Sequence, residues 1–519
     1  MDGLDNSQLD PAPVESCALL IIGAGIAGMN ALFAASRYLG KDDKVILVDR
    51  RPRNGGMWCD TYDYVRLHQP HPMFTAGNIP WTLGAAPEYL ANKPEILAHF
   101  AHCLAALRER LTLIETFEHE YLDHREVDDK GIWYAEVRIR RTDSDEPPQT
   151  IRTTRCIKAL GFDVPQNPPL ALSSAQVQSV SPDGDRLFGD KAVNPDKPVY
   201  VIGGGKTGMD TAHALLRTYP GRAVHMIVGR GTMFMNRDQT FPTGLKRWWG
   251  GKLLSQIFVD LGGRFDGDNE HAMTDYFRAH YALKLDDRFE QYLLGLLSEA
   301  ENDFIRAGIT DYGMAYLDDV VDVDGEPELV FRDGTRKAVE PGSVFVNCSG
   351  YIMRSKPAYE PYLSDHGTVV SVSPSAGIHI LTTFASYFLA HLYFLGKLDR
   401  LPLYELDHTA LMAANKLATP YAVMAQALYN VLLIMDDVPM SVMTECGLDF
   451  DRWFPLPRRI AAGLRLKRNK ARYLAHCGRA LDRIHQRFDI RCGVLESVAR
   501  RNAARVSLAQ SAEMGAHSI

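Results

Sequence analysis

Short apolar runs alternate with helical patterns along this chain, and the arrangement occurs twice around a glycine-rich turn. The first occurrence starts with an apolar run of strand length over residues 18–22, which leads into Gly23-Ala24-Gly25-Ile26-Ala27-Gly28. Residues 29–39 then show a helical pattern with few charges, and the apolar run over 45–48 indicates a second strand. This order predicts a βαβ unit, the building block of a parallel sheet.

The glycines of the first turn have the spacing of a dinucleotide-binding loop. We expect Gly23 to make the tight turn, Gly25 to let the backbone approach a pyrophosphate, and Gly28 to let helix and strand pack closely. Asp49 follows Gly28 by 21 residues, close to the roughly 20 typical of a carboxylate that binds a ribose 2′-hydroxyl. The free N–H groups at the helix N-terminus would hold the pyrophosphate. A glycine-rich turn in another kind of α/β protein is the less favoured alternative.

The second occurrence has the same order of elements around a different turn. An apolar run over 199–202 leads into Gly203-Gly204-Gly205-Lys206-Thr207-Gly208, followed by a helical pattern over 209–216 and an apolar run over 224–228. The repetition predicts a second dinucleotide-binding unit within the same chain.

The two units differ in the residue that follows their second strand. The second unit ends on Arg230, 22 residues after Gly208, a spacing that predicts a position in register with Asp49. A guanidinium cannot accept a hydrogen bond from a ribose hydroxyl, but it can bind a 2′-phosphate. We therefore expect FAD (or NAD) at the first unit and NADP(H) at the second, with Arg237 as a second candidate cation. A solvated loop arginine is the alternative for Arg230.

The remaining patterns predict an α/β fold with two Rossmann-like dinucleotide-binding domains, a helical insertion and a helical C-terminal extension. A helix is expected over 94–111 and a half-exposed strand over 132–141. The expected organisation is a disordered tail (1–16), the first part of an FAD-binding domain (17–190), an NADPH-binding domain (191–340) with a helical insertion (241–307), a return segment of the FAD-binding domain (341–400) and a helical C-terminal region (401–519).

Composition narrows the class of protein. The chain of 519 residues is 46% apolar and 23% charged, as in an ordinary globular protein, and its net charge of −7 gives no reason to expect nucleic acid as a partner. The eight cysteines form no CxxC pair, which argues for a reducing compartment and against a zinc site or a dithiol centre. No metal is expected, and the first sixteen residues do not resemble a secretory signal.

Two stretches bear on membranes and partners. The most apolar window, 378–395, contains several polar residues, so a buried strand and helix are expected there rather than a membrane span. Residues 458–505 hold fourteen Lys or Arg against three Asp or Glu. Such a tail can contact a membrane, an acidic partner or a neighbouring subunit of a homo-oligomer. A solvated helical face is the favoured interpretation, and a cytoplasmic location is expected.

The two units, the loop Gly55-Gly56-Met57-Trp58 and the stretch 61–70 together resemble the class B flavin-dependent monooxygenases. The resemblance is closest to the flavin-containing and plant indole-pyruvate branches. It covers residues 18–161 and 199–231 well, and 345–395 more loosely. The resemblance implies tightly held FAD, NADPH as the reductant, O₂ as cosubstrate, and a small-molecule substrate with an amine, a thioether or a ketone.

The resemblance also implies roles for individual residues. It implies that one oxygen atom reaches the substrate through a C4a-peroxyflavin, and that Trp58 and His68 lie near the flavin. These two are the candidate catalytic residues, because the site must exclude water, and a plain packing role is the alternative for each. The residues expected to bind FAD are Gly23, Gly25, Gly28 and Asp49, and those expected to bind NADPH are Gly203, Gly205, Lys206, Thr207, Gly208 and Arg230.

Two departures from the family pattern leave other functions open. Lys206 and Thr207 stand where the family usually carries small residues, and residues 176–188 lack the histidine of the fingerprint FxGxxxHxxx(F/Y). One alternative is an FAD-dependent NADPH oxidoreductase or oxidase that does not oxygenate a substrate. The other is a non-catalytic flavoprotein that senses nucleotides.

Overall fold

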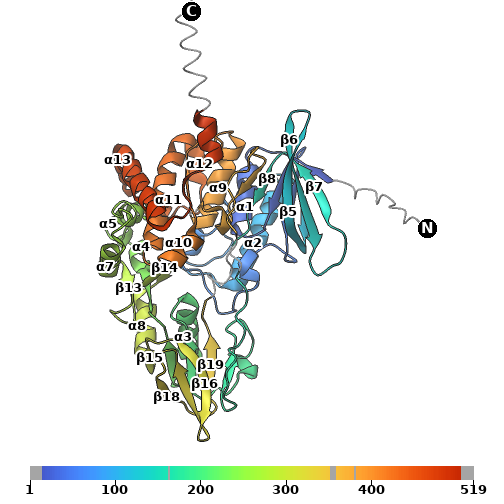
Figure 1. Cartoon of the computed structure of the whole chain (residues 1–519). Helices are drawn as coiled ribbons and strands as arrows, with labels where there is room; N and C mark the ends of the chain where they lie inside the picture. Colours follow the sequence, from blue (N-terminus) through green and yellow to red (C-terminus); the bar gives the residue numbers. More distant parts are fainter. Residues whose placement is uncertain (1–14, 162–163, 351–357, 379–380, 504–519) are drawn as a thin grey trace, which may run out of the picture.

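Two parallel sheets of five strands each form the centres of two domains in the computed structural model, which describes residues 15–161, 164–350, 358–378 and 381–503 (Figure 1). The first sheet has the order β20 (Val369–Ser371), β8 (Cys156–Lys158), β2 (Leu19–Ile22), β3 (Lys44–Asp49) and β4 (Thr112–Phe117). The second has the order β15 (Asp311–Gly313), β11 (Val224–Ile227), β10 (Val199–Ile202), β19 (Val344–Asn347) and β9 (Gln178–Val180).

The first sheet is covered on both faces, which explains why its strands are continuous apolar runs. Helices α1 (Ile26–Ala35) and α2 (Lys93–Arg108) pack against one face of this sheet, and α1 is buried along almost its whole length. Residues of β2 and β3 on the other face pack against a four-stranded sheet. That sheet has the order β1 (Glu15–Cys17), β7 (Gln149–Thr153), β6 (Ile132–Arg141) and β5 (His119–Asp129).

In the second domain, a helix and a small antiparallel sheet pack beside the parallel sheet. Helix α3 (Lys206–Thr218) follows the second glycine loop. The small sheet packs on the parallel one through Val320, Leu329 and Phe345. Its strands are β16 (Leu317–Val323), β17 (Glu326–Phe331) and β18 (Arg336–Ala338).

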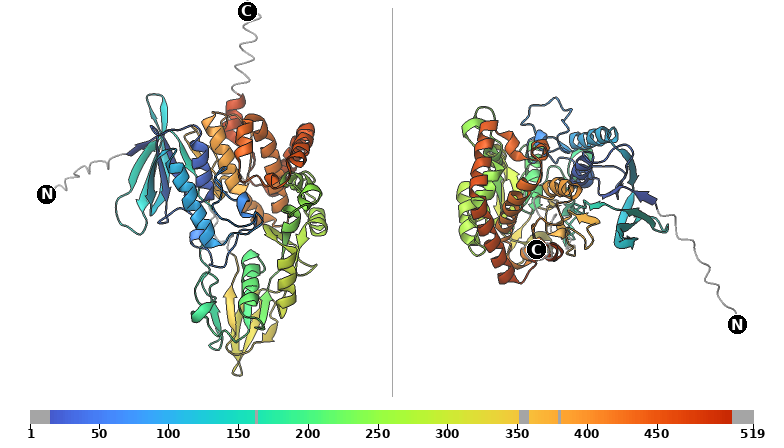
Figure 2. Two further views of the ribbon diagram at one scale, coloured as in Figure 1. Left: turned by 180° about the vertical axis from the view of Figure 1, so that it is seen from behind. Right: turned by 90° about the horizontal axis from the view of Figure 1, so that it is seen from above.

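An insertion and the C-terminal helices complete the fold along one edge of the molecule (Figure 2). The insertion contains β12 (Thr232–Asn236), α4 (Arg237–Thr240), α5 (Lys246–Trp249), α6 (Leu254–Leu261), α7 (Glu270–His280), β13 (Ala282–Leu283), β14 (Gln291–Leu297) and α8 (Glu299–Gly308). The C-terminal region contains α9 (Leu381–Phe394), β21 (Tyr404–Leu406), α10 (His408–Ala414), α11 (Thr419–Asp437), α12 (Met440–Glu445), α13 (Leu456–Phe488) and β22 (Cys492–Val494). Short 3₁₀ turns occupy Gly56–Cys59, His71–Met73, Gly189–Lys191, Pro374–Ala376 and Phe450–Trp453.

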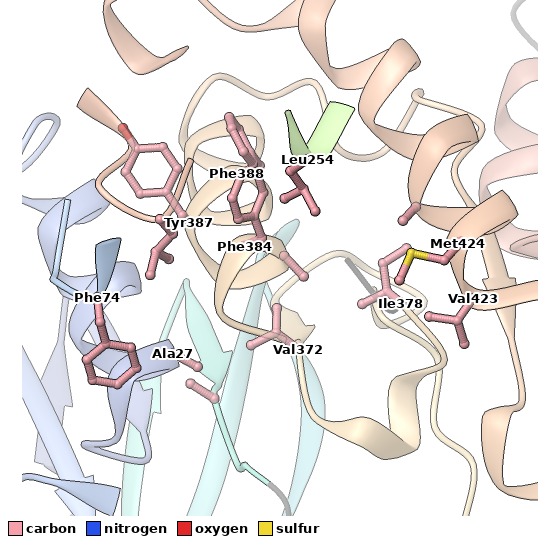
Figure 3. Packing of buried hydrophobic residues seen from close by; sticks show 14 of the residues in the cluster. Ala27, Phe74, Leu254, Val372, Ile378, Phe384, Tyr387, Phe388, Val423 and Met424 are labelled. Carbon is pink, nitrogen blue, oxygen red and sulfur yellow. The ribbon is translucent and has the colours of Figure 1, made fainter. Parts of the chain in front are cut away.

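Helix α9 joins the first domain to the C-terminal helices. Its Phe384, Tyr387 and Phe388 lie between Ala27 and Phe74 of the first domain on one side and Val423 and Met424 of α11 on the other (Figure 3). The Ser386 hydroxyl donates to the carbonyl of Ala27 at 2.6 Å. The C-terminal region therefore continues the core of the first domain.

The pairing of strands corrects parts of the expected organisation. Val344–Asn347 was expected in the return segment of the first domain, but β19 pairs with β10 of the second sheet. β9 also lies in the second sheet, although residues up to 190 were assigned to the first domain. A short apolar run shows that a strand is buried without showing which sheet buries it.

Two further expectations about single segments are wrong in part. The insertion over 241–307 was expected to be helical, but residues 291–297 form β14, which pairs with β12. The tail over 1–16 was expected to be disordered, but Glu15 and Ser16 belong to β1 and pair with β7; residues 1–14 lie outside the described part.

Candidate functional site

The first glycine loop has the backbone geometry that its sequence requires. Gly23 has φ of +102°, and a Cβ there would lie 2.6 Å from the carbonyl oxygen of Ala159. A Cβ at Gly28 would lie 1.7 Å from the carbonyl oxygen of Gly23. Both positions exclude a side chain, so the turn is tight and α1 packs directly on β2.

A second loop covers the first. The Gly55 amide donates to the Ala24 carbonyl at 3.0 Å, and a Cβ at Gly56 would lie 2.8 Å from Cα of Gly25. Trp58, in the turn that follows, is half-buried and meets Phe74 edge-to-face with ring centroids 5.8 Å apart. The covering loop therefore lies within van der Waals distance of the glycine predicted to admit the pyrophosphate.

Asp49 closes the first loop from the end of β3. One carboxylate oxygen accepts from the Ala24 amide at 2.6 Å and the other from the Arg51 amide at 2.8 Å. Each oxygen keeps a second lone pair, so a ribose hydroxyl can still donate to this carboxylate. The Arg51 guanidinium forms an ion pair with Asp60 at 2.5 Å, so its charge is paired with Asp60 rather than with Asp49.

The second glycine loop repeats this geometry with more open space. Gly203 has φ of +125°, and a Cβ at Gly208 would lie 2.1 Å from the Gly203 carbonyl oxygen. A Cβ at Gly205 would meet no described atom within 4 Å. Gly205 precedes the first turn of α3, so the free N–H groups of that helix face room for a pyrophosphate.

The strand register corrects the predicted position of Arg230. Ile22 pairs with Val48 in the first unit, and Ile202 pairs with Ile227 in the second. Val228 therefore occupies the place of Asp49, and Arg230 lies two residues further along, exposed in the loop. The spacing was misleading by two residues. The second unit has one residue fewer between its last glycine and the residue of its second strand that pairs with the end of its first strand, and Arg230 follows Gly208 by one residue more than Asp49 follows Gly28. The second unit still lacks a carboxylate at the ribose position.

Lys206 and Asp210, one turn apart on α3, form the centre of a polar cluster between the two domains. The Lys206 ammonium forms an ion pair with the Asp210 carboxylate. The Tyr62 hydroxyl, from the first domain, donates to the other oxygen of Asp210 at 2.8 Å. Burial and the adjacent carboxylate raise the pKa of Tyr62, and Thr207 also hydrogen-bonds its hydroxyl. The stretch after the covering loop is thus bonded to the start of α3.

A second contact joins the same two segments. The Tyr64 hydroxyl lies 2.7 Å from Oγ1 of Thr211 on α3, and the Cys348 thiol donates to that oxygen at 3.4 Å. The rings of Tyr62 and Tyr64 lie 4.6 Å apart. Both tyrosines therefore join the stretch after the covering loop to α3, the helix that follows the second glycine loop.

His68 lies at this junction, among charged residues of the second domain. Burial and the cations of Lys206 and Arg237 lower the pKa of its imidazole to about 4, against the effect of Asp210. The side chain is therefore neutral near pH 7. No described contact joins His68 to Trp58: His68 lies near Lys206 and Arg237, whereas Trp58 packs on Phe74.

Arg237 forms an ion pair with Glu301, which the sequence did not predict as a site residue. Its guanidinium pairs with Glu301 of α8 at 2.5 Å, while its Nη1 is buried without a partner among the described residues. Burial alone would raise the pKa of Glu301, but Lys206, Arg237 and hydrogen bonds from Ser298 hold it at about 2. Arg237 thus carries a free donor beside Lys206 and His68, a position suited to a polar group of a nucleotide.

The sequence did not predict Tyr62, Tyr64, Asp210, Thr211 or Glu301 as site residues. Tyr62 and Tyr64 fall within 61–70, a long irregular stretch of the kind that often binds something. Asp210 follows Lys206 by four residues, a spacing that places both on one helix face. No sequence pattern around Glu301 indicates a site residue.

Two glycine loops, each between a strand and a helix of a different parallel sheet, define a fold with two Rossmann-like domains. Residues 18–246 match the family model described as pyridine nucleotide-disulphide oxidoreductase, and this segment includes both loops. An uncharacterized protein of Mycobacterium tuberculosis is 26% identical over 404 residues, which is 74% of this chain and 68% of that protein.

Solved structures that match this chain include two monooxygenases and a disulfide reductase. The open crystal structure of cyclohexanone monooxygenase is 14% identical and covers 80% of this chain and 98% of that chain, with a TM-score of 0.48. A bacillithiol disulfide reductase from Staphylococcus aureus is 12% identical and covers 74% of this chain and 99% of that chain, with a TM-score of 0.43. A flavin-containing monooxygenase from Stenotrophomonas maltophilia is 13% identical, with 74% and 98% covered and a TM-score of 0.43. In the part of the chain that the structure describes, no helix is long and apolar enough to span a membrane.

Proposed function

We propose that the protein is an NADPH-dependent FAD monooxygenase that transfers one oxygen atom from O₂ to a small-molecule substrate. The observation that carries the proposal is the bonding of Tyr62 and Tyr64 to α3, because it joins the segment that follows the cover of the first nucleotide loop to the helix of the second. When bound, the flavin supplies the hydride and oxygen chemistry.

The residues of each loop fit the nucleotide assigned to it. Gly23, Gly25, Gly28 and Asp49 would hold FAD under the covering loop of Gly55 and Gly56. Gly203, Gly205, Lys206, Thr207 and Gly208 would hold the pyrophosphate of NADPH, and Arg230 its 2′-phosphate. The open space at Gly205 and the free donor of Arg237 support this assignment.

His68 would exclude water and accept or donate a hydrogen bond in its neutral form. Its lowered pKa supports this role, since a neutral imidazole is less hydrated than a charged one. Trp58 would exclude water on the side of the first domain, where it packs on Phe74.

The cysteines favour oxygenation over thiol chemistry. All eight are free, and burial raises the pKa of Cys348 to about 12, so its thiol is protonated at neutral pH. A dithiol reductase needs two neighbouring reactive thiols near the flavin. No such pair occurs among the described residues.

Reoxidation of the reduced protein by oxygen tests the proposal. The protein is reduced with NADPH and mixed with oxygen in the presence of NADP⁺, while absorbance and hydrogen peroxide are followed. Slow, two-phase reoxidation, with peroxide released only in the second phase, supports a monooxygenase. Single-phase reoxidation with stoichiometric peroxide indicates an oxidase. FAD and NADPH binding without NADPH oxidation indicates a nucleotide sensor.

A further inference from the structure

Six large apolar side chains lie exposed around α5 and the start of α13. Their exposed fractions run from 53% to 71%. A folded protein commonly exposes such side chains singly, but a group of them marks an interaction surface. The six are Leu245, Trp248 and Trp249 beside and on α5, and Leu456, Ile460 and Leu464 on α13.

Direct hydrogen bonds hold the two segments together. The Arg458 guanidinium donates to the carbonyls of Arg247 at 2.9 Å and Gly250 at 2.5 Å. Arg247 in turn donates to the carbonyl of Trp453 at 2.7 Å. α5 and α13 lie along the same outer edge of the molecule, away from the four-stranded sheet of the first domain (Figures 1 and 2). The six exposed side chains therefore come from two segments that are bonded to each other, and we call these segments together the α5/α13 face.

The three apolar residues of α13 form a stripe along the helix. Leu456, Ile460 and Leu464 are spaced by four residues, so they share one side of it. The opposite side is buried through Ala462 and Leu466. The stripe is therefore not the core-facing side of the helix, and no described residue covers it.

Cations border the stripe, and carboxylates are absent from it. Lys467 and Arg468 follow on the next turn, both exposed and without an ion pair among the described residues. Neither residues 239–259 nor residues 452–481 contain an Asp or Glu. The nearby Asp260 is engaged by Lys252 at 2.7 Å. Asp436 is likewise engaged by Lys470 of α13 at 2.5 Å. The face is therefore apolar with a surplus of cations, although the whole chain carries a net charge of −7.

We propose that the α5/α13 face docks the protein on an anionic phospholipid surface. Tryptophans beside aliphatic side chains and Lys or Arg are the residues that bind at the boundary between lipid headgroups and acyl chains. A second copy of the chain is disfavoured as the occupant, since two such basic faces repel one another. This docking is peripheral, and it does not depend on the proposed function.

Cosedimentation with vesicles of phosphatidylcholine, with and without phosphatidylglycerol, tests the proposal. We expect the protein to bind the vesicles that contain phosphatidylglycerol, and the binding to weaken as salt is raised. Each Lys or Arg near an anionic surface contributes about 5-fold in binding. The double variant Lys467→Gln/Arg468→Gln should therefore bind about 10- to 30-fold more weakly.

Two further variants separate lipid binding from other effects. Trp248→Ala/Trp249→Ala should also lose at least about 10-fold in vesicle binding, since two interfacial side chains are removed. Ile132→Ser, which changes an equally exposed residue on β6, is the control and should bind like the wild type. The proposal is wrong if the wild type does not bind the anionic vesicles, or if all variants bind equally. It is also wrong if the wild type is a dimer in solution that these substitutions convert to monomer. All these residues are exposed, so folding should be retained, and unchanged melting temperatures verify it.

Discussion

Replacement of Arg230 by alanine should weaken the binding of NADPH far more than the binding of NADH. Arg230 is exposed in the loop after β11, and the ribose position before it is the apolar Val228. Loss of the guanidinium should weaken binding of NADPH, which carries a 2′-phosphate, and leave NADH almost unaffected. The preference for NADPH should then collapse.

The exposure of Arg230 sets the size of the effect. A charge-assisted contact contributes about 1.5–3 kcal/mol. Solvent screens an exposed pair, so we expect a value near the lower limit, about 1.5 kcal/mol. That free energy corresponds to roughly a 10-fold higher Michaelis constant for NADPH. The rate of flavin reduction at saturation should change little, because the contact lies away from the nicotinamide and stabilises ground and transition states alike.

Steady-state kinetics with both coenzymes, together with stopped-flow flavin reduction, provides the measurement. Arg217→Ala is the matched control, since Arg217 is exposed on the last turn of α3. A helix of this length spans about 20 Å, beyond the roughly 10 Å over which charges act at 0.1 M salt. Equal losses with NADPH and NADH, an equal loss in Arg217→Ala, or a wild-type preference for NADH would refute the assignment.

Four further predictions concern the first loop and the residues where the two domains meet. Gly25→Val should yield protein with little or no FAD, measured by flavin absorbance, because its side chain would extend from a Cβ only 3.4 Å from Cα of Gly56; normal FAD content would contradict the first nucleotide site. His68→Ala should retain NADPH oxidation but release more of the oxygen as hydrogen peroxide, and unchanged coupling with the true substrate would make His68 structural. The folded pKa of His68, about 4, lies below the unfolded value of roughly 6.5. The unfolded chain therefore binds more protons between these pH values, and about 1–3 kcal/mol of unfolding free energy is lost as the pH falls through them. The variant His68→Gln should not show this loss when its unfolding free energy is measured by denaturant titration at several pH values. The same pH dependence in the variant and the wild type would contradict the prediction. Tyr62→Phe removes a donor to the Asp210 carboxylate and should cost about 1.5–3 kcal/mol of unfolding free energy, with an accompanying rise in the Michaelis constant for NADPH; an unchanged melting temperature and constant would show that the contact is dispensable.

The sequence predicts the nucleotide loops well because several independent signals coincide there. A buried strand, glycines with fixed spacing, and a helix that follows directly leave few other conformations. The strand β6 coincides with its expected range, 132–141, because alternation of apolar and polar residues is specific to a half-exposed strand. Both regions depend mainly on local sequence.

Features that depend on distant residues were harder to predict. Val344–Asn347 is a buried strand in any fold, and only its pairing with β10 assigns it to the second domain. Residues 291–297 form β14 because β12 offers an edge to pair with, and their leucine-rich sequence does not show this. Arg230 was placed by counting residues, and a connection of different length displaced it. Glu301 meets Arg237 only through the packing of the insertion.

The order of strands in the first sheet has a consequence for synthesis on the ribosome. β2 and α1 are made near the start, yet β20 and α9, which complete the sheet and cover α1, are made only after residue 369. At about 5–20 residues per second, the chain between them takes roughly 20–70 s to emerge. All five strands of the second sheet lie within 178–347, so that domain can fold while the first is still incomplete. During this interval the apolar surface of α1 has no permanent cover, which makes the nascent first domain a target for chaperones. A chain that ends before α9 should therefore fail to retain FAD, although both glycine loops are present.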